Sequence, residues 1–212
     1  MNAERRSGWL AGDAEILRDL SAGDWLTIAA VTLGCAAVTS VFLTPIAAVA
    51  ATILGALAVT VAATDARLLL VPDVLSLALF TTGLAAATAI AAFQPDPFGL
   101  TDPWPTALAL GLAGSAVGAA VLAALRWVWI KARSVEAMGF GDIKLAAGLG
   151  AWLGPIDIFT AFAVAAVAGL ALVAVARILG RAGPRSVTES NRLPFAALLA
   201  PAAWVVFVLM RL

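Results

Sequence analysis

Long apolar runs separated by short polar segments dominate the chain. Runs long enough for a membrane-spanning helix lie at 25–43, 46–64, 74–93, 105–130, 157–178 and 193–210, and a shorter run lies at 142–154. About 20 mainly apolar residues cross the hydrocarbon core of a bilayer as a helix. The pattern therefore predicts an all-α fold, a polytopic integral membrane helix bundle.

Polar segments set the expected boundaries of these helices. Thr44-Pro45 offers a turn between the first two spans, and residues 94–105 contain four prolines and are expected to form a loop. Residues 179–192 form a second polar loop in this interpretation. We expect residues 1–24 to be a polar cytoplasmic segment and residues 25–212 to be the transmembrane domain.

The polar N-terminal segment has two interpretations. An apolar face of an interfacial helix would consist of Trp9, Leu10, Ile16, Leu17 and Leu20. A frayed cytoplasmic tail is the alternative. Further along the chain, Gly111, Gly114 and Gly118 have the small-residue spacing that is typical of closely packed membrane helices.

Basic residues indicate the number and orientation of the spans. With seven spans and a cytoplasmic N-terminus, 12 of the 13 Lys and Arg residues lie on the cytoplasmic side, and only Arg211 lies outside. If 142–154 does not span, the resulting six-span model divides them 9 against 4, because the four Arg residues of 177–192 lie outside and Arg211 lies inside. Cytoplasmic loops are enriched in Lys and Arg, so seven spans with the N-terminus inside is the preferred model.

Composition excludes several classes of protein. Hydrophobic residues make up 63% of the chain and charged residues 12%, whereas a soluble domain carries roughly 25% charged residues. A soluble globular protein and a disordered chain are both excluded. The formal net charge is +0, so no nucleic-acid partner is expected.

The missing residue types restrict the possible chemistry. The sequence has no His and one Cys, Cys35, which lies inside an apolar run. Zinc sites built on His or Cys, disulfide frameworks, Cys–His dyads and Ser–His–Asp triads are therefore excluded. An enzyme of this composition must use carboxylates, hydroxyls and a few Lys or Arg residues, and we expect neither a metal nor another cofactor.

Sorting the 13 acidic residues by position isolates four of them. Solvated surface charge explains Glu4, Asp13, Glu15, Asp19, Asp24, Asp96, Asp102 and Glu189, and Asp157 is expected to be an interfacial or capping residue. The other four lie at the cytoplasmic ends of predicted spans: Asp65, Asp73, Glu136 and Asp142. Ionisable groups at membrane depth are costly, so they indicate function.

Two of these four acids have distinctive surroundings. Asp65 closes the second span, where the negative end of the helix dipole disfavours a carboxylate. Asp142 follows Gly139-Phe140-Gly141, and its structural interpretation is a plain turn in which it caps the next helix. Asp73 follows Pro72 and has a good structural interpretation as the N-cap of the third span.

Both Asp65 and Asp142 fall at the same membrane face in the seven-span model. A pair of carboxyl groups that shares one proton can hydrolyse a peptide bond without a metal, a His or a nucleophilic Ser. The ionised member takes a proton from water, and the protonated member polarises the carbonyl. Such a pair titrates as a unit, so neither role is assigned to either residue.

These residues carry a family resemblance. Gly139-Phe140-Gly141-Asp142 resembles the GxGD motif of intramembrane-type aspartyl proteases, and the segment EAMGFGDIKLAAGLGAWLG resembles the second active-site segment of type IV prepilin peptidases. Asp65 through Leu75 is similar to the first active-site segment of that family. Arg192-Leu193-Pro194-Phe195 resembles its Pro-Phe segment, although Ala196 replaces the usual Gly. The resemblance covers roughly 46–205.

The resemblance implies a multi-pass peptidase of the cell (inner or plasma) membrane with its active site at the cytoplasmic face. Its substrates would be prepilins or pseudopilins, cut after a Gly that ends a short basic leader. Asp65 and Asp142 would be the catalytic pair. Substrate-binding or supporting roles would fall to Asp73, Glu136, Gly139, Gly141 and Lys144. The partners would be the prepilin and the lipid bilayer.

Larger family members carry an N-terminal domain with paired Cys-x-x-Cys motifs and also N-methylate the new N-terminus. This chain resembles the shorter peptidase type, so methyl transfer is not expected. A small proton-coupled transporter or a structural membrane protein is the alternative, but such transporters place their sites near the bilayer midplane. A presenilin-like protease would need its first Asp deep within a span, whereas Asp65 lies beside Arg67.

Overall fold

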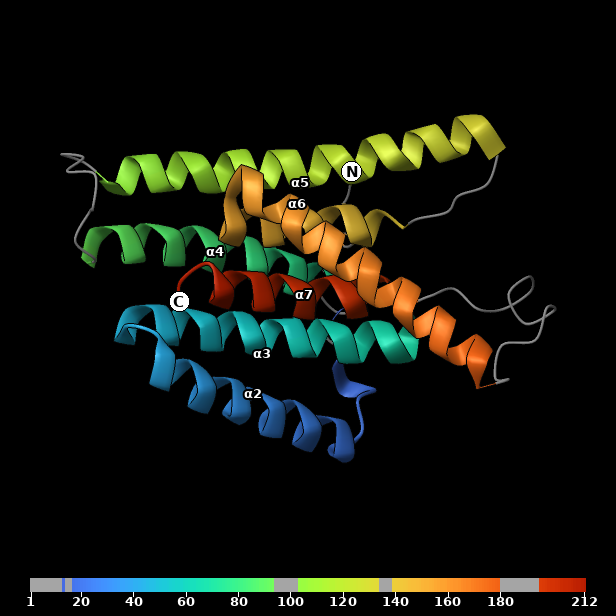
Figure 1. The fold of residues 1–212 in the computed structure, drawn as a ribbon, viewed down its shortest axis with the longest axis horizontal. Helices are drawn as coiled ribbons and strands as arrows, with labels where there is room; N and C mark the ends of the chain where they lie inside the picture. Colours follow the sequence, from blue (N-terminus) through green and yellow to red (C-terminus); the bar gives the residue numbers. More distant parts are fainter. Residues whose placement is uncertain (1–12, 14–16, 94–102, 134–138, 180–194) are drawn as a thin grey trace, which may run out of the picture.

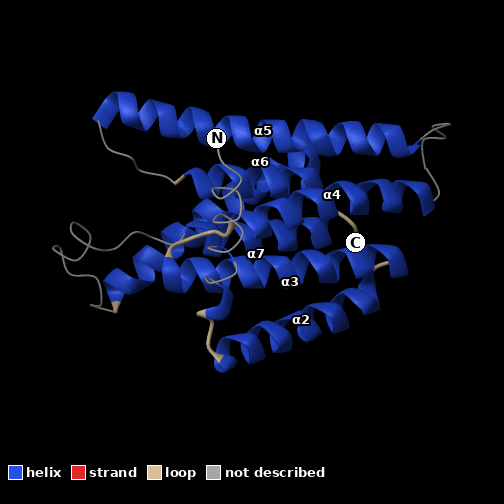
Figure 2. Ribbon diagram, turned by 180° about the vertical axis from the view of Figure 1, so that it is seen from behind, coloured by secondary structure: helices blue, strands red, loops and turns tan. Residues whose placement is uncertain are grey.

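The computed structural model describes residues 13, 17–93, 103–133, 139–179 and 195–212. The helices labelled in Figure 1 are α2 (Ala22–Phe42), α3 (Pro45–Leu68), α4 (Asp73–Phe93), α5 (Pro103–Arg133), α6 (Phe140–Ile178) and α7 (Phe195–Leu209). The described residues form no strand (Figures 1 and 2). Five of these helices are long and apolar enough to cross a membrane, and α7 is shorter. The predicted all-α membrane helix bundle is confirmed.

Successive helices alternate in direction. Figure 1 shows the turn between α3 and α4 on the right, together with the end of α5 and the beginnings of α2, α6 and α7. We call this end of the bundle, which carries the turn at residues 69–72, the polar end. Segments that are far apart in the sequence meet there, among them the segment Asp65 through Leu75 and the beginning of α6 with Gly141-Asp142.

Helix α6 is broken in its interior. Gly154 has φ 79° and ψ −179°, a conformation that only glycine adopts readily, and Pro155 follows it. In Figure 1 the chain turns back at this break, so the part of α6 before Gly154 runs away from the polar end and the part after it returns. The break lies where the sequence predicts a boundary between 142–154 and 157–178. The seven-span count and the orientation of the N-terminus remain predictions.

Glycines bring α5 and α6 into close contact. A Cβ atom on Gly114 would lie 2.2 Å from the carbonyl oxygen of Gly150, and one on Gly118 would lie 2.5 Å from that of Ala146. At Gly111 a Cβ would lie 2.9 Å from the Leu84 side chain. The close packing that the spacing of these three glycines predicts is confirmed. In a membrane the hydrophobic effect does not drive helices together, so close packing of backbones at small residues stabilises their contact instead.

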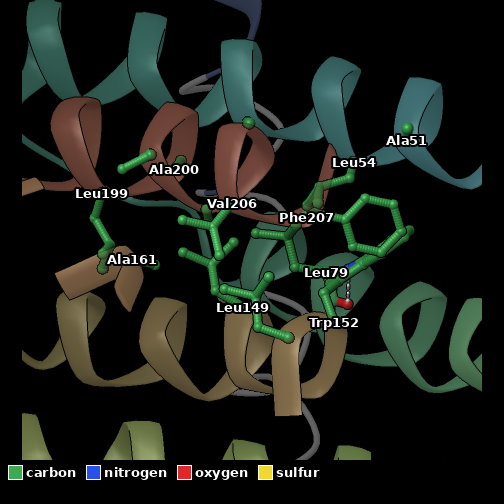
Figure 3. Packing of buried hydrophobic residues seen from close by; sticks show 14 of the residues in the cluster. Ala51, Leu54, Leu79, Leu149, Trp152, Ala161, Leu199, Ala200, Val206 and Phe207 are labelled. Atoms are coloured by element: carbon green, nitrogen blue, oxygen red, sulfur yellow. Dashed lines mark hydrogen bonds between the residues drawn. The ribbon is translucent and has the colours of Figure 1, made fainter. Parts of the chain in front are cut away.

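The buried core lies between α3, α4, α6 and α7 (Figure 3). Leu54, Leu79, Leu149 and Phe207 come from these four helices, and each is at most 1% exposed. Trp152 donates a hydrogen bond from Nε1 to the Leu79 carbonyl oxygen at 2.8 Å, and its ring meets that of Phe207 edge-on with centroids 5.5 Å apart. The first part of α6 is therefore held inside the bundle.

The beginning of the described chain packs on the polar end. Asp24 is buried and forms a capping box with Ser21 as well as an ion pair with Arg67, so the prediction that it is a solvated surface charge is wrong. Its ion pair joins the start of α2 to the end of α3. Asp13 accepts a hydrogen bond from the Val74 backbone N–H at 3.1 Å, and Leu20 is buried.

One loop boundary also differs from the sequence prediction. Helix α5 begins at Pro103, so the last residues of the predicted loop 94–105 are helical. Proline is tolerated in the first turn because the N–H groups there have no partner within the helix. Residues 94–102 lie outside the described part of the chain, as does most of the loop predicted at 179–192.

The α5–α6 contact makes a testable prediction. Gly114→Ala places a methyl group against the backbone of Gly150 and Gly154, so the helices must separate. We expect a loss of about 1–3 kcal/mol of stability, measured as a lower Tm of the purified protein in detergent.

Gly34→Ala provides the matched control. Nothing described lies within 4 Å of a Cβ built on Gly34, which lies in the middle of α2. Alanine is the better helix former, so this variant should keep or slightly raise the Tm. Equal Tm values for both variants would contradict the close packing at Gly114.

Candidate active site

Asp65 lies in the last turn of α3 and is 5% exposed. The helix ends just after it because Leu69 adopts a left-handed conformation, φ 52°, and its N–H donates to the Asp65 carbonyl oxygen. The side-chain carboxyl group therefore lies beside the carbonyl groups that end α3. Their partial negative charge disfavours a carboxylate there.

The first turn of α7 supplies the partners of this buried carboxyl group. The backbone N–H of Ala197 donates to Asp65 Oδ2 at 2.8 Å, and the N–H of Ala196 also hydrogen-bonds the carboxyl group. Helix α7 begins at Phe195, so both are N–H groups that have no partner within the helix. The Asp65 carboxyl group thus accepts hydrogen bonds from the first turn of α7, a helix far away in the sequence.

Asp142 lies near the beginning of α6 and is partly buried. The N-cap of α6 is Gly139, and Asp142 is the third helical residue, whose carboxyl group accepts a hydrogen bond from the Gly139 N–H. The structural interpretation of Asp142 as the N-cap is therefore wrong. It occupies instead the position from which an acid reaches back to the cap, as in a capping box.

The polar end brings the two acids together. The carboxyl groups of Asp65 and Asp142 lie close enough to interact electrostatically, although they belong to α3 and α6. A Cβ atom on Gly141 would lie 3.5 Å from Cβ of Val71 in the turn at residues 69–72, so this turn and the start of α6 are in contact. The sequence prediction that both acids lie at the same end of the bundle agrees with this arrangement.

Asp73 and Lys144 form an ion pair beside the two acids. Lys144 Nζ lies 2.7 Å from each oxygen of the Asp73 carboxylate, which joins the start of α4 to the first turns of α6. The carbonyl oxygen of Pro72 accepts the N–H groups of Leu75 and Ser76, so Pro72 holds the cap position of α4. The interpretation of Asp73 as that N-cap is wrong, because Asp73 is the first helical residue.

The two glycines of the Gly-Phe-Gly-Asp segment are not required by internal packing. A Cβ on Gly139 would meet described atoms no closer than 3.8 Å, and one on Gly141 would make ordinary contacts with Val71. Neither glycine has a positive φ. This contrasts with Gly114, where a Cβ would clash with backbone. Between the two glycines, the exposed Phe140 ring lies under the Arg126 guanidinium at 4.5 Å.

The sequence prediction of the site is incomplete in two ways. Ala196 and Ala197 contribute through backbone N–H groups, which cannot be predicted from residue type. In the sequence they are indicated only by the Pro-Phe pair that precedes them. Glu136 lies outside the described residues. Among the residues that the structure describes, no cluster of three or more His, Cys, Asp or Glu side chains could hold a metal ion.

Comparison with known proteins identifies the family of this chain. The model of the type IV leader peptidase family matches residues 52–174, which include Asp65 and Asp142. The chain belongs to this family. No solved structure gives a significant match.

Named relatives support the same assignment. The prepilin leader peptidase/N-methyltransferase of Xanthomonas campestris pv. campestris is 31% identical over 160 residues, which are 74% of this chain and 48% of that relative. The Burkholderia pseudomallei protein of the same name is 33% identical over 156 residues, 73% of this chain and 44% of the relative. The protein of that name from Pseudomonas aeruginosa is 32% identical over 145 residues, 66% of this chain and 42% of the relative. The chain thus spans less than half the length of these curated relatives.

The ion pair between Asp73 and Lys144 makes a prediction about stability. Both side chains are more than one third exposed, so the pair contributes about 0.2–1 kcal/mol. Asp73→Asn should lower the Tm slightly, and Asp73→Lys should lower it further because two cations then face each other. The Tm of each purified variant in detergent is the measurement.

The exchanged pair Asp73→Lys/Lys144→Asp serves as the control. It restores opposite charges across the same contact and should recover much of the Tm that Asp73→Lys loses. A double variant less stable than Asp73→Lys alone would show that the two side chains do not stabilise the protein through their charges.

Proposed function

We propose that this chain is a membrane aspartyl endopeptidase that removes the short basic leader from type IV prepilins or pseudopilins at the cytoplasmic face of the inner membrane. The observation that carries the proposal is the proximity of Asp65 and Asp142, each on its own active-site-like segment. The family of the chain and the names of its relatives support the substrate class.

The proposed reaction needs only the two carboxyl groups and water. Close like charges cannot both ionise readily, so the pair retains one proton. The ionised carboxylate removes a proton from water as the water oxygen attacks the scissile carbonyl carbon, and the protonated carboxyl group hydrogen-bonds the carbonyl oxygen that becomes negative. When the C–N bond breaks, a proton passes from the pair to the leaving amine.

Neighbouring residues have supporting roles in this proposal. The exposed Gly139 and partly buried Gly141 lie next to Asp142 and have room for an approaching substrate backbone. Lys144 balances the charge of Asp73, so Asp73 is better suited to holding α4 against α6 than to attracting a basic leader. Glu136, an acidic residue shortly before Asp142 in the sequence, is the residue proposed to attract the basic leader. Methyl transfer is not part of the proposal.

Substitution of each proposed catalytic acid tests the function. Asp65→Asn and Asp142→Asn keep the size of the side chain but remove the acid. Each should lower leader cleavage by about a hundred- to ten-thousandfold, measured as shortening of a co-expressed, tagged prepilin at equal levels of membrane-inserted enzyme.

Asp157→Asn is the matched control, because Asp157 lies just after the α6 break, and Figure 1 shows this break away from the polar end, where the two acids lie. This variant should cleave the prepilin as the unmodified chain does. Cleavage by Asp65→Asn or Asp142→Asn at the control rate would refute the catalytic role of that residue. A non-catalytic role at the membrane edge would then replace it.

A further inference from the structure

A buried acid at the end of its own helix needs a compensating partner. Asp65 lies beside the carbonyl end of α3, which disfavours its charge, and it is almost inaccessible to water. Burial of a carboxylate is costly unless hydrogen-bond donors replace the lost water. Among the residues that the structure describes, the N–H groups of Ala197 and Ala196 donate to this carboxyl group.

Packing and hydrogen bonds fix the position of helix α7 beside Asp65. It packs against both α3 and α6, and its Leu199, Ala200 and Ala203 are fully buried (Figure 3). Farther along α7, Trp204 Nε1 donates to the Ala51 carbonyl oxygen of α3 at 2.8 Å. The two hydrogen bonds tie α7 to α3 at two separate levels. The position of the first turn of α7 is therefore determined by packing and does not depend on Asp65 alone.

A backbone N–H can only donate, so an oxygen that accepts it is favoured as a carboxylate oxygen. The N–H of Ala197 fixes Oδ2 in particular. A carboxyl group that is held at one oxygen cannot rotate freely about its bond to Cβ. Its other oxygen therefore keeps one orientation. A pair that activates water requires this, because small displacements of reacting groups lower the reaction rate.

We infer that the first turn of α7 is a positioning element of the catalytic pair, in which the N–H groups of Ala196 and Ala197 hold the Asp65 carboxyl group in its working orientation toward Asp142. This inference rests on the proposed function. It also gives a reason for a small residue at position 196. The Ala196 side chain is 0% exposed, so a larger one would push the N–H groups away from Asp65.

Proline at position 197 removes one donor with little harm to the helix. The N–H groups of the first turn have no partner within a helix, and proline is tolerated there. Loss of a hydrogen bond to a charged group corresponds to a factor of about 10–100. We expect Ala197→Pro to lower kcat for cleavage of a tagged prepilin by this factor, with KM within about threefold of its original value.

Ala197→Gly keeps the N–H and is the conservative comparison. It should lose far less of kcat than Ala197→Pro does. Equal losses of kcat in the two variants, or full kcat in Ala197→Pro, would overturn the inference. The kinetics use the full chain, purified in detergent, at concentrations corrected for the folded fraction.

A second measurement does not depend on catalysis. Thermal unfolding is compared for Asp65→Ala, Ala197→Pro and the double variant. If the hydrogen bond exists, the Tm loss of the double variant is smaller than the two single losses added together. Additive losses would contradict the contact. Prepilin cleavage by Asp65→Ala at the original rate, with non-additive Tm losses, would instead refute the proposed function and leave the α7 contact standing.

Discussion

The buried carboxyl group of Asp65 is the constraint on which the polar end of the bundle depends. It lies where the end of α3 disfavours negative charge, and little water reaches it. The N-terminal turn of α7 compensates for both effects. Its N–H groups have no partner within the helix, carry partial positive charge and donate hydrogen bonds in place of water. One contact therefore satisfies an acid and a helix end, and it requires α7 to begin beside the end of α3.

Helix α6 must then bring Asp142 to the same place from within the bundle. Its first part runs between α4, α5 and α7 and is too short for an ordinary span. The glycine contacts with α5 let this part lie inside the bundle, and the break at Gly154 lets the chain turn back. The short run that makes the span count of the sequence ambiguous is thus a buried segment. Its length follows from its position in the core, where residues of neighbouring helices, such as Leu79 of α4 and Phe207 of α7, surround it in place of lipid.

The sequence predicts most of the helices and both candidate acids, because hydropathy marks the spans and the Gly-Phe-Gly-Asp segment marks Asp142. It cannot predict the donors to Asp65, since every residue except proline carries a backbone N–H. Asp24 and Asp73 show a second limit. Their residue types and positions suggest a solvated charge and a cap, but Arg67 and Lys144, which bind them, belong to other helices. Such partners become visible only when the helices pack.

The polar segment at residues 1–24 shows how far the support of the site extends. The ion pair of Asp24 with Arg67 acts just before the turn at residues 69–72, and the hydrogen bond from Val74 to Asp13 acts just after it. Val71, inside this turn, contacts Gly141, the residue before Asp142. This turn, which lies within the first segment of the family resemblance, is therefore held from both sides by the N-terminal part of the chain. A segment that the sequence also allows as a frayed tail thus contributes to the relative position of Asp65 and Asp142.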